Sequence, residues 1–271
     1  MTSLPLKWHG GKQKLWRWIW EHAPEHTHRV VPYAGGLGFL LNSPLGASEV
    51  VNDLDRHLYN FWAVLRDPER FEELQRFAEA TPVSSAVWEE ASTYLGLCTY
   101  TEELDIHAAW ALLVLVRQSR QGLRKDFCTL SKTRTRRGIN EQASSWLSAV
   151  EGLSEAHDRL KGVVVLNRPA IDVIQKEDSP STWFYLDPPY LHETRVTTED
   201  YTHEMSYDEH LDLLDVLGQI QGKFCLSGYP SELYNEAVKL FGWRCEKREV
   251  PNHASGKKTK EKKIECLWMN Y

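Results

Sequence analysis

Apolar residues recur with two different periods along this chain, and each period predicts a different element. Short apolar runs rich in β-branched and aromatic residues predict strands at Arg29–Val31, Ser48–Val51, Val163–Leu166, Thr182–Leu186, Phe224–Ser227, Trp243–Val250 and Ile264–Met269. Apolar residues spaced three and four apart predict helices at Gln13–His22, Arg56–Leu65, Ala86–Leu97, Ala108–Val116, Asn140–Leu160, Tyr207–Ile220 and Glu232–Phe241. Strands alternate with helices toward both ends, so we expect an α/β fold with a mostly parallel sheet and helices on both of its faces.

The middle of the chain follows a different pattern. Residues 66–160 are expected to be mainly helical, and they separate the first two predicted strands from the third. We therefore predict two domains. Residues 1–65 and 161–271 form the α/β domain, and residues 66–160 form a helical insertion that returns the chain to the same sheet.

Composition narrows the class of protein. The 271 residues are 42% hydrophobic and 26% charged, as in an ordinary globular protein that buries a sizeable core. Apolar runs are shorter than a membrane span, and the first residues do not resemble a signal peptide. The five cysteines are scattered without a C-x-x-C pair, which predicts neither a disulfide framework nor a zinc site. We expect a cytoplasmic, monomeric protein with no bound metal.

A carboxylate, two prolines and a tyrosine end the apolar run Thr182–Leu186. These residues are Asp187, Pro188, Pro189 and Tyr190. Proline fixes φ and lacks the backbone N–H, so the strand must stop at this point, at the edge where open α/β sheets bind ligands. The carboxylate, the unpaired carbonyls and the ring together suit a planar ligand with an exocyclic amino group. The alternative is a capped strand end with an ordinary Pro-Pro turn.

Three segments near the amino terminus also carry ligand-binding features. The first is Lys7-Trp8-His9-Gly10-Gly11-Lys12, and the second is the glycine-rich turn Pro32–Phe39. The third, Val51–Asp55, ends a predicted strand, and Asp53 is placed to accept hydrogen bonds from both hydroxyls of a ribose. Asp55 is better explained as the N-cap of the helix that follows. A core tryptophan and a tight turn without a ligand are the structural alternatives.

Along the chain, the three amino-terminal segments come first and the turn Asp187–Tyr190 follows. In this sequence order, the four segments resemble those of the Dam-type N6-adenine-specific DNA methyltransferase family, and of its phage members in particular. The resemblance extends from about Leu6 to Tyr271. It implies a Rossmann-like class I S-adenosylmethionine-dependent methyltransferase sheet with an inserted, mainly helical target-recognition domain. It also implies double-stranded DNA as the partner and S-adenosylmethionine as the cofactor.

The resemblance assigns roles to particular residues. Catalysis is assigned to Asp187, Pro188, Pro189 and Tyr190. Cofactor binding is assigned to Trp8, Lys12, Tyr33, Gly35, Gly36, Asp53 and Asp187. Two positions depart from the family pattern and bear on cofactor affinity, because Val31 stands where an acid is usual and Leu37 where a third glycine is common.

Charge is distributed unevenly. The net charge of −6 does not by itself favour a DNA-binding protein. However, the segment Arg117–Arg137 is strongly basic, and a second basic stretch contains Lys257, Lys258, Lys260, Lys262 and Lys263. Because the resemblance places target recognition in the first segment, we predict DNA contacts by Arg117, Arg120, Arg124, Lys125, Arg134, Arg136 and Arg137. A solvated basic surface is the alternative.

The expected function is therefore site-specific transfer of a methyl group from S-adenosylmethionine to the N6 amino group of adenine in DNA. The target base must leave the duplex, since its amino group is otherwise paired. Methylation of cytosine N4, RNA or a protein amide remains an alternative, and so does a DNA-binding relative without activity. A cognate restriction endonuclease, as in restriction-modification systems of bacteria and phages, is a further open possibility.

Overall fold

The computed structural model describes residues 4–194, 203–251 and 262–271, so Lys257, Lys258 and Lys260 lie outside the described residues. The chain divides into two compact units built from interleaved segments. Unit 1 comprises Met1–Arg17, Gly35–Leu45 and Asp55–Asn167, and unit 2 comprises Trp18–Ala34, Gly46–Leu54 and Arg168–Tyr271. The helical segment 66–160 lies wholly within unit 1.

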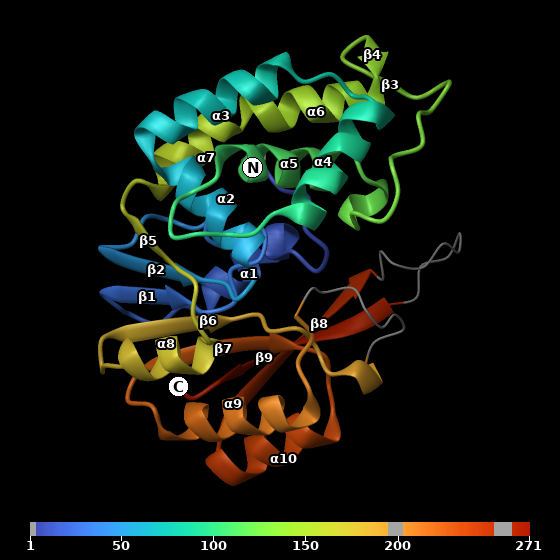
Figure 1. The fold of residues 1–271 in the computed structure, drawn as a ribbon. Helices are drawn as coiled ribbons and strands as arrows, with labels where there is room; N and C mark the ends of the chain where they lie inside the picture. The colour runs from blue at the N-terminus through green and yellow to red at the C-terminus, as the bar shows by residue number, and fades with distance from the viewer. Residues whose placement is uncertain (1–3, 195–202, 252–261) are drawn as a thin grey trace. The chain divides into compact units, whose positions relative to one another are not determined.

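A largely parallel sheet confirms the predicted α/β class (Figure 1). Seven strands within the described residues follow the order β5-β2-β1-β6-β7-β9-β8. Their bounds are β1 (His28–Val31), β2 (Ser48–Asn52), β5 (Val163–Leu166), β6 (Thr182–Leu186), β7 (Lys223–Gly228), β8 (Arg244–Pro251) and β9 (Lys262–Met269). β1 pairs in parallel with β2 and β6, and β6 with β7, whereas β9 runs antiparallel to β7 and β8. The first five positions have the 3-2-1-4-5 order of Rossmann-like sheets.

The centre of the sheet is fixed by buried side chains. All five residues of β6 are buried, and Val30 of β1 pairs in register with Val50 of β2 and Phe184 of β6. Arg29 and Glu49 are also register partners, and their side chains form an ion pair that is almost fully buried. Breaking either pairing would cost buried apolar area or leave a charge unpaired. The carboxyl ends of β2, β1, β6 and β7 therefore share one edge.

Helices of unit 2 connect these strands. They are α8 (Ala170–Lys176), α9 (Tyr207–Gln219) and α10 (Glu232–Phe241), with the 3-10 turn η3 (His192–Thr194) after β6. α9 lies beside both α8 and α10 (Figure 1). Ser206 and Glu209 form a capping box at the start of α9, and Gly242 ends α10 with a φ of 69°. The apolar pattern did not predict α8, because it is short.

Unit 1 is built around one apolar helix, α5. Its helices are α2 (Arg56–Arg66), α3 (Pro68–Ala80), α4 (Ser85–Leu97), α5 (Ile106–Arg117), α6 (Glu141–Glu151) and α7 (Leu153–Leu160). Residues 108–116 of α5 are all buried, and α2, α3, α4 and α6 contact this helix. Within the described residues, no helix has both the length and the apolar character of a membrane span.

Shorter elements complete unit 1. They are the 3-10 turns η1 (Lys12–Lys14) and η2 (Arg120–Gly122) and the hairpin of β3 (Thr135–Arg136) with β4 (Ile139–Asn140). α1 (Trp16–Glu21) begins in unit 1 and ends in unit 2. The single helix predicted at Asn140–Leu160 was wrong, because α6 and α7 meet at Gly152. α3 was not predicted, since its buried stripe is only Phe71, Leu74 and Ala78.

Trp8 packs against the glycine-rich turn in unit 1. A Cβ placed on Gly36 would lie 2.4 Å from the Cβ of Trp8, and one on Gly35 would lie 3.1 Å from the indole ring. Gly35 has a φ of 49° and Leu37 a φ of 53°, so the turn keeps a left-handed backbone at the position where the resemblance would lead us to expect a third glycine. The side chain of Leu37 is only 2% exposed, so its burial offsets the conformational strain, which costs about 1–2 kcal/mol.

We predict that Gly36→Ala destabilises the protein by about 1–3 kcal/mol, because the added methyl group overlaps the side chain of Trp8. Thermal unfolding followed by circular dichroism measures the effect. Gly96→Ala in α4 is the matched control, since open space surrounds that position and alanine favours a helix. Equal midpoints for Gly36→Ala and the wild type would contradict the packing of Trp8 on this turn.

Candidate active site

The turn predicted to be catalytic lies at the carboxyl edge of the parallel strands in unit 2. Asp187 directly follows β6 and is half-buried, and Pro188 behind it is buried. At the same edge, Tyr229 follows β7, which is next to β6, and Asp53 follows β2, which is separated from β6 by β1. The strand order thus explains why side chains far apart in sequence end at one edge.

Tyr190 is held by contacts from strand β9 and from the residue that follows β7. Its hydroxyl donates a hydrogen bond to Oε1 of Glu265 on β9, and its ring meets that of Tyr229 edge-on, with centroids 4.7 Å apart and planes at 76°. The ammonium group of Lys263 lies 4.4 Å from the centroid of the Tyr229 ring. Tyr190 therefore presents an aromatic ring whose orientation is set by β7 and β9.

Burial and negative charge keep the neighbouring phenols protonated. The pKa of Tyr190 is raised well above its usual value by burial and by the charges of Glu265 and Asp187. The pKa of Tyr185 on β6 is also raised, first by burial and then by the charge of Asp187, and its hydroxyl lies 2.9 Å from Oγ of Ser227. Neither phenol supplies a base at neutral pH, so Asp187 is the side chain of this turn that offers a carboxylate acceptor.

Asn52, which the sequence did not single out, organises the loops beside Asp53. Its Nδ2 donates to the carbonyl oxygens of Pro32 at 2.9 Å and Arg168 at 3.0 Å, and its Oδ1 accepts from the backbone N–H of Arg168 at 2.9 Å. The backbone carbonyl of Asn52 accepts from the N–H of Ala34 at 2.8 Å. These bonds fix the turn that contains Tyr33 next to the end of β2. Burial raises the pKa of Tyr33.

The amino-terminal segment of unit 1 carries the other predicted cofactor residues. Trp8 is half-buried against Gly35 and Gly36, as described above. Lys12 is only 7% exposed, and its Nζ donates to the carbonyl oxygen of Gly10 at 2.9 Å. Within unit 1 the structure thus brings together four of the seven predicted cofactor residues, Trp8, Lys12, Gly35 and Gly36, while Tyr33, Asp53 and Asp187 belong to unit 2.

Asp55 has the structural role that the sequence predicted. It caps α2, and its Oδ1 accepts from the N–H of His57 at 2.8 Å. Its other carboxylate oxygen lies 3.9 Å from Nη1 of Arg124, whose guanidinium group also lies 5.3 Å from the centroid of the Trp8 ring. Arg124 therefore contacts the same tryptophan that packs on the glycine-rich turn.

The basic segment of unit 1 contains two kinds of cation. Nη2 of Arg117 donates to the carbonyl oxygen of Ser145 at 2.7 Å, and burial lowers the pKa of this arginine to about 10. Arg134 pairs with Glu141 at 3.2 Å, and Arg137 pairs with both oxygens of Glu151 at 2.8 and 3.0 Å.

Other cations of the segment are exposed to solvent. Arg120, Lys125 and Arg136 are exposed, and Arg136 stands beside the turn of the β3–β4 hairpin, where Arg137 and Gly138 have φ values of 57° and 78°. Those two left-handed residues are what a tight hairpin turn requires. Arg134 and Arg137 are exposed as well, although each pairs with a glutamate.

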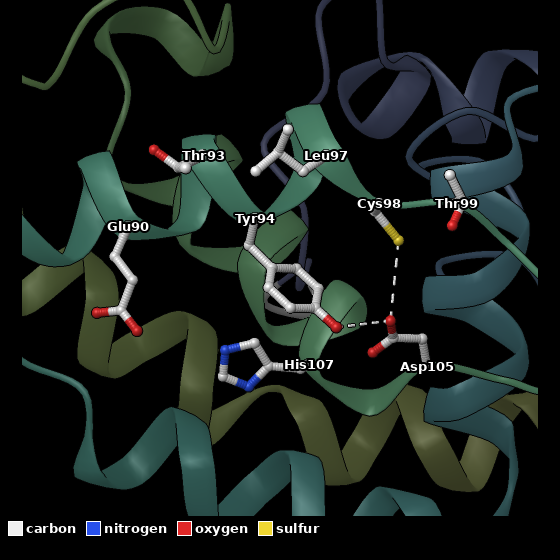
Figure 2. A pocket seen from close by; sticks show the side chains of 8 residues that line it. All are labelled: Glu90, Thr93, Tyr94, Leu97, Cys98, Thr99, Asp105 and His107. Atoms are coloured by element: carbon white, nitrogen blue, oxygen red, sulfur yellow. Dashed lines mark hydrogen bonds between the residues drawn. The ribbon is translucent and has the colours of Figure 1, made fainter.

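A separate hollow of about 660 Å³ lies between α4 and α5 (Figure 2). Asp105 lines it and also caps α5, and its Oδ2 accepts from the hydroxyl of Tyr94 at 2.8 Å. This hydrogen bond raises the pKa of Tyr94 to about 12. Glu90 gives the hollow a second acid, so its walls do not favour phosphate. None of the predicted site residues lines it.

Potential metal ligands are not clustered in the described part of the chain. Among the described residues there is no group of three or more His, Cys, Asp or Glu side chains that could hold a metal ion. The five cysteines are free thiols, three of them buried.

Comparison with known proteins identifies the family of this chain. Residues 8–251 match the model of the D12 class N6 adenine-specific DNA methyltransferases. A relative, the type II methyltransferase M1.LlaDCHI of Lactococcus lactis subsp. cremoris, is 27% identical over 263 residues, which cover 87% of this chain and 84% of the relative. The match to the family model takes in all the predicted site residues. The chain therefore belongs to the D12 class of N6 adenine-specific DNA methyltransferases.

Proposed function

We propose that this protein transfers the methyl group of S-adenosylmethionine to the N6 amino group of adenine at a specific sequence in double-stranded DNA. Family membership supports adenine in DNA as the substrate. The observation that carries the proposal is the turn Asp187–Tyr190 at the carboxyl edge of β6, with an acceptor and an oriented aromatic ring three residues apart.

The residues present suit S-adenosylmethionine. In unit 2, Asp53 ends β2 at the ligand-binding edge, where its carboxylate would accept hydrogen bonds from the ribose hydroxyls. In unit 1, Trp8 offers an aromatic face beside Gly35 and Gly36, and Lys12 would pair with the carboxylate of the methionine moiety. When bound, this cofactor supplies an electrophilic methyl group.

The residues of the catalytic turn would prepare the adenine amino group. Asp187 accepts one amino hydrogen and the backbone carbonyl of Pro188 accepts the other, while Tyr190 stacks on the base. Two such hydrogen bonds localise on nitrogen the lone pair that free adenine delocalises into its ring. The charge of Asp187 also stabilises the positive charge that develops on nitrogen, which is an electrostatic contribution. Extruding the base costs a few kcal/mol, and stacking on Tyr190 offsets part of this cost.

Exposed cations of unit 1 would bind the DNA backbone. Arg120, Lys125 and Arg136 are open to solvent, as phosphate contacts require, whereas Arg117 is engaged with Ser145. Arg136 lies on a two-stranded antiparallel hairpin, an element of the kind that the major groove of a duplex can admit. Under this proposal, helical segment 66–160 recognises the target, and a monomer suffices for one methyl transfer per site.

The proposal predicts that Asp187→Ala lowers methyl transfer by at least about 10²-fold, because it removes an acceptor and the negative charge beside the reacting nitrogen. Transfer of tritiated methyl from S-adenosylmethionine to unmethylated genomic DNA measures the rate. Calorimetric titration with S-adenosylhomocysteine should show that cofactor affinity changes much less than the rate.

Asp208→Ala is the matched control for this variant, since Asp208 is an exposed carboxylate in the first turn of α9. It should transfer methyl groups at the wild-type rate. Normal turnover by Asp187→Ala would refute the mechanism, and an inactive wild-type protein on all DNA would refute the function.

Arg136→Ala tests the DNA-binding face. We expect a loss of roughly threefold to tenfold in affinity for duplex DNA and a salt dependence whose slope falls by about one, as loss of one phosphate contact requires. Fluorescence anisotropy over a range of potassium chloride concentrations measures both. Lys161→Ala is the control, because Lys161 is an exposed cation outside the basic segment that pairs with Asp158. Equal slopes for Arg136→Ala and the wild type would exclude a phosphate contact by Arg136.

A further inference from the structure

A buried carboxylate, Glu265, lies against the tyrosine of the catalytic turn. Glu265 is only 4% exposed and is followed in β9 by the apolar run Cys266–Met269. Removing a carboxylate from water is costly unless hydrogen bonds satisfy it. The hydroxyl of Tyr190 donates one such hydrogen bond. The free-energy cost of burying the carboxylate is therefore partly offset by the contact that anchors the ring of Tyr190.

The position of Glu265 is set by the sheet. Its neighbour Cys266 pairs with Gly228 of β7, and Glu265 itself pairs with Arg248 of β8. Side chains two residues apart on a strand share a face, so Lys263 and Glu265 project to the same side of β9. The carboxylate is thus carried by a rigid strand with partners on both sides.

Two contacts then define the ring plane of Tyr190. The bond to Glu265 fixes the hydroxyl end, and the ring of Tyr229, 4.7 Å away and nearly perpendicular, blocks rotation about the ring axis. Lys263 lies on the ring of Tyr229 and holds this second contact in turn. A tyrosine at a loop end would otherwise sample several rotamers.

We propose that Glu265 is a positioning residue for methyl transfer, which holds the ring of Tyr190 in the orientation that stacks on the extruded adenine. The inference rests on the proposed function, since it assumes that Tyr190 stacks on the target base. Glu265 does not touch the base, and it acts only through Tyr190. A base held in the wrong plane would place its amino group away from Asp187 and lower the rate of transfer without loss of cofactor binding.

Three variants test the inference. Glu265→Met keeps the length of the side chain and removes the acceptor, Tyr190→Phe keeps the ring and removes the donor, and Glu265→Gln keeps an acceptor oxygen. We expect Glu265→Met and Tyr190→Phe each to lower kcat about tenfold, the double variant to be no slower than either single variant, and Glu265→Gln to recover most of the rate. Affinity for S-adenosylhomocysteine should stay near the wild-type value, whereas Tyr190→Phe should lower the melting midpoint, because it takes a hydrogen bond from the buried carboxylate of Glu265.

Glu249→Gln is the matched control, because Glu249 is an exposed carboxylate on β8 that pairs with Lys262. It should keep the wild-type kcat. Ultraviolet titration of tyrosine provides a readout that does not depend on activity. In Glu265→Met one tyrosine should ionise at lower pH than in the wild type, since a negative charge beside it is lost, and this change should be absent when Tyr190→Phe is added.

A wild-type kcat in Tyr190→Phe or Glu265→Met would overturn the inference, and so would independent, multiplicative losses in the double variant. If Glu265→Met fails to fold, Tyr190→Phe decides the matter, because it removes the same hydrogen bond from the other side. Methyl transfer by the wild-type protein in the same assay reports on the proposed function, so failure of the inference is distinguishable from failure of that function.

Discussion

Parallel pairing of β1 with β2 and with β6 is the constraint on which the proposed active site depends. It places Asp53, the turn that contains Tyr33, and Asp187 at one edge of the sheet of unit 2, although these residues span more than half of the chain. The register is held by apolar pairs and by the buried ion pair of Arg29 with Glu49. A slip of one residue would separate these charges and turn every side chain to the opposite face.

Several side chains hold the loops and rings of the proposed active site in place by hydrogen bonding and packing. Asn52 ties together the loops that follow β1 and β5, and Glu265 anchors the ring of Tyr190 from the antiparallel strand β9. In unit 1, Trp8 occupies the space that the side chains of residues 35 and 36 would need if they were not glycines. In each unit a polar or aromatic side chain thus sets the position of a neighbouring turn. This division of roles is expected where reacting groups must be held within fractions of an ångström.

The features that the sequence predicted are those with a local physical signal. An apolar run stopped by Pro188 and Pro189 predicted the end of β6, and a short acid before a helical pattern predicted the cap by Asp55. The placement of Glu265 beside Tyr190 could not be predicted, because it depends on the antiparallel register of β9. The one available signal was a lone carboxylate directly before an apolar run. The hydrogen bond of Arg117 to the carbonyl oxygen of Ser145 could not be predicted either. A run of basic residues has the same sequence pattern whether or not one of them pairs with a distant carbonyl group. Only the backbone could show that Leu37 keeps a left-handed conformation.

The most direct test of this account identifies the atom that receives the methyl group. Unmethylated duplex DNA is incubated with the wild-type protein and S-adenosylmethionine that carries a labelled methyl group, digested to nucleosides and analysed by mass spectrometry. The account predicts that the label appears in N6-methyladenine, because Asp187 and the carbonyl of Pro188 would hold an adenine amino group. Label in N4-methylcytosine, or DNA without label despite cofactor binding, would contradict it.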